Sequence, residues 1–129
     1  MLTTPADSAF SDCIRDRANW ICEVCGVQYY PPTNGLQCHH YFGRDFWATR
    51  FDPENCISVC YHCHTKLHSD TDFHLEFFKK RLGDRYDALK ARAHDPMLAK
   101  LYRQTKGKGL IARHYRDCLT NKSLVIFQF

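Results

Sequence analysis

The sequence predicts an α+β fold in which two short strands and a helix form a small metal-binding core, with further helices toward the C-terminus. Two Cys-x-x-Cys pairs, Cys22/Cys25 and Cys60/Cys63, enclose a segment with the turn signals of a β-hairpin. After residue 70, apolar residues recur at helical spacing behind capping residues. A chain of 129 residues can bury one core, so we expect a single domain over 1–129. Within it we expect a core over about 20–69, a helical extension over about 70–105, and a basic link with an apolar tail over 106–129.

The bulk composition excludes several classes of protein. Gly and Pro are few, at 6 and 5 residues, and aromatic residues are plentiful, so neither disorder nor a collagen-like repeat is expected. No stretch is apolar and long enough to cross a bilayer, and the first residues lack the basic start and apolar run of an export signal. We therefore expect a cytoplasmic protein with no membrane partner. The net charge of +4 suits a polyanionic partner but does not by itself indicate one.

The N-terminal part is expected to hold a short helix and a metal knuckle. Helical spacing of apolar residues over 11–20 predicts the helix, with Ser11 or Asp12 as its cap. Gly26 directly follows the second cysteine of the first pair, where it lets the backbone fold back beneath a metal. Residues 29–35 are rich in Pro, Asn and Gly and predict a turn-rich connector.

The middle of the chain predicts a β-β-α order. Residues 36–41 are short and bounded by turn signals, and 57–59 with their flanks are the expected antiparallel partner strand. A loop of about a dozen residues joins the two strands, and such a long loop in a compact domain is usually functional. Helical spacing from 61 to 67 completes the unit.

Three further helices are expected to pack behind this unit. The first runs over 70–82 and is closed by Gly83, the second covers 85–93, and the third begins at Asp95-Pro96 and continues through 102. A flexible basic link over 106–109 precedes a helical stretch over 110–116. The last residues, 123–129, form a strand-like apolar tail, which either docks on its own domain or joins a second chain, making a homodimer possible.

Cysteine spacing predicts a structural zinc site. Zinc in structural sites takes four ligands in a tetrahedron, and two Cys-x-x-Cys knuckles are a common way to supply them. Cys22, Cys25, Cys60 and Cys63 meet this requirement, and the absence of an export signal favours reduced thiols over disulfides. The remaining cysteines are expected to be small buried apolar residues without an assigned role: Cys13, Cys38, Cys56 and Cys118.

A histidine cluster predicts a second, catalytic metal site. His64 and His68 are four residues apart on one helix face, so two imidazoles can share an ion. His39, on the strand facing that helix, can supply the third ligand and leave positions open for water and a phosphate oxygen. Cys63 and His64 are about 100° apart around the helix, so they can serve two metals on two sides of it. One larger zinc-finger cluster, or plain surface histidines, would explain the same residues.

His40 is the expected general base, because a neutral imidazole can deprotonate water near neutral pH. Adjacent residues of a regular strand point to opposite faces. A bulge, or the end of the strand near Tyr41, must therefore bring His39 and His40 to one site.

Taken together, the order Cys-x-x-Cys, His39-His40, Asn55, Cys60-x-x-Cys63-His64-x-x-x-His68 resembles the HNH (ββα-metal) nuclease motif. The resemblance implies that His40 is the base, that His39, His64 and His68 bind the catalytic metal, and that Asn55 holds the base and its loop. A wider stretch over roughly the first two thirds of the chain resembles the phage NinG (Rap) recombination nucleases. That group has Gly-His in place of His39-His40 and Cys-Asn in place of Cys63-His64.

This resemblance implies a DNA endonuclease that acts on branched recombination intermediates, such as Holliday junctions or displacement loops, in a bacterial or phage-infected host cell. It implies one catalytic divalent cation, Mg²⁺, Mn²⁺, Ni²⁺, Co²⁺ or Zn²⁺, beside the structural zinc. Three imidazole ligands shift the preference from Mg²⁺ toward the later metals. Two cuts in a symmetric junction would suit a homodimer.

Three basic residues are expected to contact DNA phosphates. Arg44 and Arg50 flank the loop between the strands, where a guanidinium can grip two phosphate oxygens, although either could be an ordinary surface charge. Lys66 would add sequence-independent attraction. Two other functions stay open: a non-catalytic zinc-stabilised module that binds nucleic acid or protein, and a zinc-dependent hydrolase of another substrate.

Overall fold

The fold of the computed structural model is α+β, with one two-stranded sheet among the described residues, which are 2–104 and 109–129. Its elements follow one another as α1 (Pro5–Arg17), β1 (Leu36–His40), the 3₁₀ turn η1 (Pro53–Asn55), β2 (Cys56–Cys60), α2 (Tyr61–Ser69), α3 (Thr71–Leu82), α4 (Arg85–Ala93), α5 (Pro96–Gln104) and α6 (Gly109–Asn121). Over these described ranges, the helices are all too short or too polar to cross a membrane. The predicted link over 106–108 lies outside the described residues, and Gly109 begins α6.

Helix α1 begins at Pro5 rather than near residue 11, so the predicted start was wrong. Thr4 caps the helix: its hydroxyl accepts from the Asp7 amide, and the Asp7 carboxylate accepts from the Thr4 amide 2.8 Å away. Pro5 occupies the first helical position, where its missing N–H costs nothing. The apolar spacing used for the prediction detected only the second half of this helix.

The strands pair in antiparallel register, with Leu36 opposite Cys60 and His40 opposite Cys56. All five residues of β2 are buried, because α1 and α2 both contact the hairpin. Helix α2 follows β2 directly, with Cys60 as its N-cap residue. The β-β-α order expected from the sequence is therefore present.

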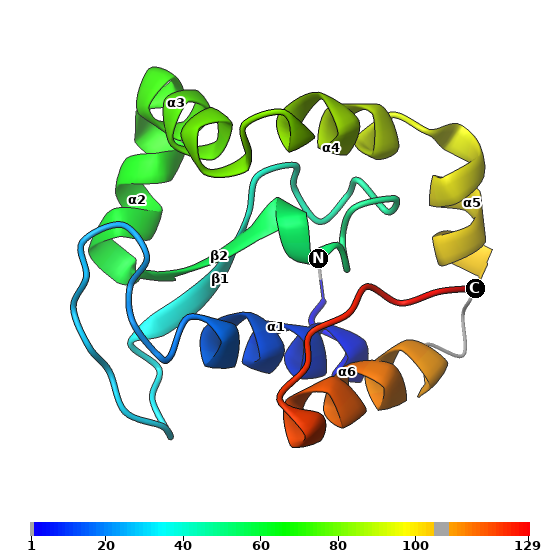
Figure 1. Cartoon of the computed structure of the whole chain (residues 1–129), viewed down its shortest axis with the longest axis horizontal. Helices are drawn as coiled ribbons and strands as arrows, with labels where there is room; N and C mark the ends of the chain where they lie inside the picture. The colour runs from blue at the N-terminus through cyan, green and yellow to red at the C-terminus, as the bar shows by residue number, and fades with distance from the viewer. Residues whose placement is uncertain (1, 105–108) are drawn as a thin grey trace.

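The apolar core consists of two clusters. One joins β2, α2, α3 and α4, and the other joins α1, α6, Tyr102 of α5 and the chain after α6. Helices α3 and α4 lie along one side of the molecule, α5 lies at its end, and α1 and α6 lie together on the other side (Figure 1). Of the three helices expected behind the metal unit, α3 and α4 pack there, whereas α5 packs on the α1/α6 cluster through Tyr102.

The C-terminal tail docks on its own domain and is not a strand. Leu124 and Phe127 pack against the α1/α6 cluster, and the Phe127 amide donates to the Tyr115 hydroxyl at 3.1 Å. The edge of β2 that faces away from β1 is occupied by Glu23, whose carboxylate accepts from the Ser58 amide at 2.7 Å. The tail pairs with no described strand, and its apolar side chains cover helices instead.

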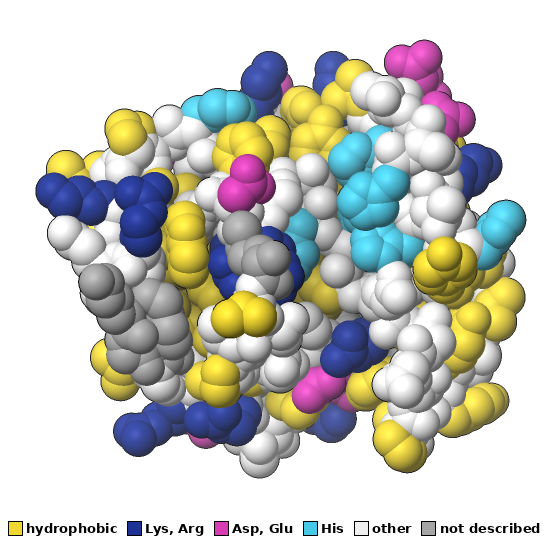
Figure 2. Space-filling model, turned by 180° about the vertical axis from the view of Figure 1, so that it is seen from behind, with side chains coloured by type: hydrophobic (Ala, Val, Ile, Leu, Met, Phe, Trp, Pro, Cys, Tyr) yellow, Lys and Arg dark blue, Asp and Glu magenta, His cyan; other side chains and the backbone are white. Residues whose placement is uncertain are grey.

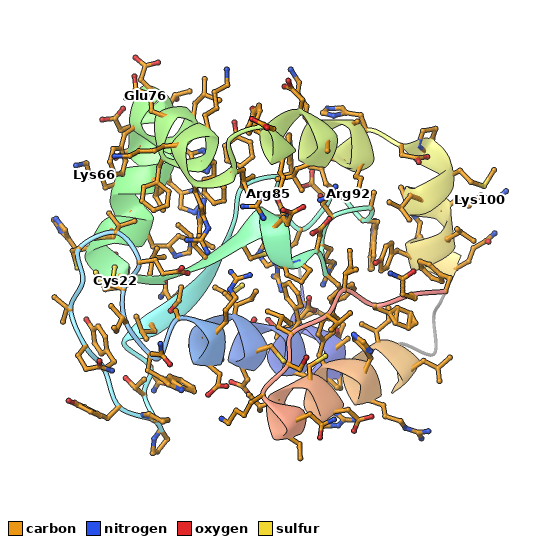
Figure 3. The ribbon with its side chains drawn as sticks, viewed as in Figure 1. Cys22, Lys66, Glu76, Arg85, Arg92 and Lys100 are labelled. Carbon is orange, nitrogen blue, oxygen red and sulfur yellow. The ribbon has the colours of Figure 1, made fainter. Side chains whose placement is uncertain are left out.

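Ion pairs fix α4 over the segment that precedes β2. Arg92 reaches Asp52 at 2.8 Å and Glu54 at 3.0 Å, and Arg85 reaches Glu54 at 2.7 Å. Figure 3 shows both arginine side chains of α4 near η1. These ion pairs therefore hold α4 against η1, the turn that carries Asn55.

Candidate metal centres and the histidine cleft

The four cysteines of the two knuckles come together in one group. Their sulfur atoms all lie within 4.8 Å of one another, and Cys25 Sγ is 3.9 Å from Cys60 Sγ. A tetrahedral zinc with Zn–S bonds of about 2.3 Å requires S···S separations of about 3.8 Å. The group could therefore hold a structural metal, as the spacing predicts.

Backbone hydrogen bonds fold the segment from Cys22 to Val27 into a tight turn that carries the first two cysteines. The Cys22 amide donates to the Val27 carbonyl at 2.9 Å, and the Gly26 amide donates to the Cys22 carbonyl at 2.8 Å. Gly26 has φ +81°, a conformation that favours glycine. Burial raises the pKa of the Cys22 thiol, but hydrogen bonds from the amides of Cys25, Cys60 and Val24 outweigh it and lower the pKa to about 7. This favours the thiolate that a metal requires.

Glu23 attaches this knuckle to the sheet and to α3. Its amide donates to the Ser58 carbonyl at 2.8 Å, and its carboxylate accepts from the Ser58 amide at 2.7 Å and from Arg81 at 2.8 Å. Because Ser58 lies on β2, which pairs with the strand that carries His39, these bonds tie the knuckle to the same sheet as the histidine cluster.

His39, His64 and His68 form the second group that the sequence predicts. One ring nitrogen of each lies within 4.8 Å of the others, and the Nε2 atoms of His64 and His68 are 3.1 Å apart. His39 is 1% exposed, and its Nδ1 is buried without a hydrogen-bond partner among the described residues. An unpartnered buried ring nitrogen beside two converging imidazoles fits a divalent cation.

His74 of α3 also belongs to this cluster, and the sequence analysis missed it. Its Nε2 lies 2.8 Å from His39 Nε2, so one ring donates a proton to the other. His74 is one helical turn before Phe78, which is buried. That spacing, applied to histidines as well as apolar residues, would have placed His74 on the face of α3 directed at the sheet.

His40 is held in a defined tautomer. Its Nε2 lies 2.9 Å from the carbonyl oxygen of Arg50, which can only accept, so Nε2 carries the proton and the Nδ1 lone pair is left for other use. Burial lowers the pKa of His40 to about 4, partly offset by the bond to Arg50. The ring is therefore neutral near pH 7, with its Nδ1 lone pair unprotonated.

His39 and His40 line one cleft although β1 is regular. The register runs unbroken to His40, the last residue of β1, so the two side chains leave opposite faces of the strand, and both still line the cleft. The cleft of about 630 Å³ is lined by His39, His40, His64, His68 and Arg44, among others. Figure 2 shows histidine side chains gathered on this side of the molecule.

Asn55 closes the loop between the strands. Its Nδ2 donates to the carbonyls of Phe42 at 2.9 Å and Thr49 at 3.0 Å, and its Oδ1 accepts from the Phe42 amide at 2.9 Å. The side chain is fully buried. It thereby fixes both ends of the loop that supplies the Arg50 carbonyl to His40.

The basic residues expected at DNA lie in three different environments. Arg50 is 2% exposed, and Asp7 binds its guanidinium at 2.9 and 2.7 Å, so the structure corrects the expectation of a phosphate contact there. Arg44 lines the cleft and lies 3.9 Å from Asp7. Lys66 lies over the Phe73 ring at 4.2 Å, outside the residues that line the cleft.

Two cysteines without an expected role meet at His40. A nitrogen of His40 and the sulfur atoms of Cys38 and Cys56 lie within 4.8 Å of one another. Cys13 donates to the Tyr115 carbonyl at 2.9 Å, and Cys118 is buried on α6.

Comparison of the chain with protein-family models, with characterised proteins and with solved structures gave no match.

Proposed function

We propose that this chain is a metal-dependent DNA endonuclease of the HNH type. The observation that carries the proposal is the His40 ring, neutral and fixed by the Arg50 carbonyl, in the same cleft as His39, His64 and His68. A base and a set of metal ligands that open into one cleft are the minimum machinery for metal-assisted phosphodiester hydrolysis. A zinc at Cys22, Cys25, Cys60 and Cys63 would hold α2, and with it His64 and His68, against the hairpin.

Each residue has a separate role in the proposed reaction. A divalent cation at the three histidines would supply Lewis acidity toward a phosphate oxygen and the leaving oxygen. His40 accepts the proton of the attacking water at Nδ1, and the Arg50 carbonyl stabilises the resulting imidazolium through Nε2. Arg44, with 29% of its side chain exposed, lines the cleft and would contact a phosphate there.

Branched recombination DNA is the proposed substrate, on the strength of the resemblance to the NinG nucleases. The test is cleavage of labelled four-way junction, flap and plain duplex DNA with Mg²⁺, Mn²⁺ or Ni²⁺. We expect preferential cutting of the junction, and its loss on His40→Ala with the fold retained. Equal cutting of all three substrates would support the nuclease without the junction preference.

His62→Ala is the matched control, because His62 is an exposed histidine on the same helix as His64 and His68. Full activity of an intact His40→Ala protein would overturn the assignment of the base. Absence of cutting by the wild type with every metal would favour the zinc-stabilised binding module, and cutting of a different ester would favour the other hydrolase.

A further inference from the structure

Cys38, His40 and Cys56 form a third group of potential metal ligands, separate from the two groups already described. Side chains two residues apart on a strand share a face, so Cys38 and His40 lie on the face of β1 opposite His39. The register places Cys56 of β2 directly across from His40. Both strands thus contribute to one cluster with two sulfur donors and one nitrogen donor.

Two of the three members of this cluster reach the cleft. Cys38 and His40 line the cleft, whereas Cys56 is fully buried within the α1/α6 cluster beneath them. A cation entering from the cleft would meet three protein ligands and keep one position for water. That is the ligand count of a zinc site with an open position.

The tautomer of His40 suits such binding. The Arg50 carbonyl engages Nε2, which leaves Nδ1 as the nitrogen with a lone pair to donate. A backbone carbonyl that holds the second nitrogen of a histidine is a common support for metal ligation. The same lone pair is the one the proposed nuclease needs for water.

We propose that Cys38, Cys56 and His40 bind a thiophilic divalent cation such as Zn²⁺ or Cd²⁺, and that this binding inhibits the nuclease by occupying the base. The inhibition rests on the proposed function, whereas the binding does not. On binding, the two thiols lose their protons to solvent, and two thiolates neutralise the charge of the cation. A site without net charge suits the buried position of Cys56.

Ligand softness separates this site from the three-histidine site. Two thiolates select Zn²⁺ or Cd²⁺ strongly over Mn²⁺ or Mg²⁺, whereas three imidazoles accept a wider range of cations. The chain would therefore be active with Mn²⁺ and inhibited when a thiophilic metal is added.

The binding test is a Cd²⁺ titration of the full, reduced chain, followed by thiolate-to-metal charge-transfer absorption. After the phase that belongs to the four-cysteine group, we expect a further phase from two thiolates in the wild type. Cys38→Ser and Cys56→Ala should each lose the amplitude of that phase, and circular dichroism should confirm that they fold. Cys118→Ser is the matched control, because Cys118 is buried on α6, outside all three groups. Equal second phases in the wild type and in Cys38→Ser would overturn the proposal.

The inhibition test adds Cd²⁺ to cleavage supported by Mn²⁺, with each variant normalised to its own rate without Cd²⁺. Cys38→Ser should require at least about tenfold more Cd²⁺ for half inhibition, since loss of even an indirect partner of a metal ligand costs that much affinity. Unchanged sensitivity would overturn the inhibitory role. If the wild type shows two-thiolate binding but no cleavage, the proposed function is refuted and the metal site is supported. If the wild type cleaves DNA but shows no second phase, the metal site is refuted and the proposed function is supported.

Discussion

The carbonyl oxygen of Arg50 lies 2.9 Å from His40 Nε2, while the guanidinium of the same residue is held by Asp7 at 2.9 and 2.7 Å. Asp7 lies in the first turn of α1, so this one arginine connects the start of the chain to the proposed base. A residue expected to touch DNA instead positions the loop that fixes the histidine. The stability of this ion pair and the geometry of His40 are therefore linked.

Replacement of Asp7 should destabilise the protein strongly. Asp7→Asn removes the carboxylate charge that pairs with the buried Arg50 guanidinium, and breaking such a pair costs about 3–5 kcal/mol. Urea unfolding followed by circular dichroism measures the loss. Asp12→Asn is the control, because Asp12 lies on the same helix with 45% of its side chain exposed and should change stability by less than about 1 kcal/mol. A similar loss of stability in Asp7→Asn and Asp12→Asn would contradict the stabilising role of the buried Asp7–Arg50 pair.

The contribution of Asp7 to the free energy of unfolding should also depend on pH. Burial raises the pKa of this carboxyl, but bonds from Arg50 and Thr4 and the charge of Arg50 outweigh burial and lower it below the ordinary value of 3.8. A lowered folded-state pKa gives stability that is fully present well above 3.8 and is lost as pH falls through the folded-state pKa. The difference in unfolding free energy between wild type and Asp7→Asn should therefore be constant near neutral pH and shrink in acid. A difference that grows in acid would refute this assignment.

Asn55 should matter for both stability and cleavage. Asn55→Ala leaves the Phe42 amide and the Phe42 and Thr49 carbonyls without their buried partner, at a cost of at least about 2 kcal/mol. The loop that positions Arg50 should loosen, so kcat should fall more than DNA affinity. Asn55→Asp should not restore activity, because a carboxylate cannot donate to the two carbonyls. Asn34→Ala, in an exposed turn, is the control, and equal effects of Asn34→Ala and Asn55→Ala would contradict the prediction.

His74 should strengthen metal binding by holding His39. His74→Ala removes the ring 2.8 Å from His39 Nε2, and loss of such a partner lowers metal affinity by about 10- to 100-fold. Calorimetric titration of zinc-loaded protein with Ni²⁺ measures the change directly. His62→Ala should bind Ni²⁺ as the wild type does, and unchanged affinity of His74→Ala would show that His39 needs no such support.

Loss of one knuckle thiol should reduce metal content and stability together. Cys25→Ala leaves three of the four sulfur ligands, so native mass spectrometry should find one zinc fewer and thermal unfolding should occur at a lower temperature. A chelator should lower the unfolding temperature of the wild type toward that of Cys25→Ala. Cys118→Ala should retain the full metal content. Equal zinc content in Cys25→Ala and wild type would place the metal elsewhere.

Much of the site could be predicted because its ligands follow short-range spacing rules. Cys22 and Cys25 lie in one tight turn, and His64 and His68 share one face of α2. His39 lies on β1, which precedes that helix. Each of these relations depends on the period of one element and on local backbone geometry. The helices over 71–82 and 85–93 were predicted for the same reason, since caps and apolar periods are local signals.

Tertiary structure decided which side chains meet across elements. Arg50 has the sequence context of a surface cation, and only the approach of α1 brings Asp7 to it and buries both. His74 joins the cluster because α3 folds back onto the sheet, and Cys56 meets Cys38 and His40 because of the strand register. The tail over 123–129 has the composition of a strand, yet its apolar side chains pack on helices, and Glu23 bonds to Ser58 at the edge of β2 that faces away from β1. Spacing along the chain determines which ligands one element presents, whereas burial, countercharge and free hydrogen-bonding edges depend on what the rest of the fold places beside them.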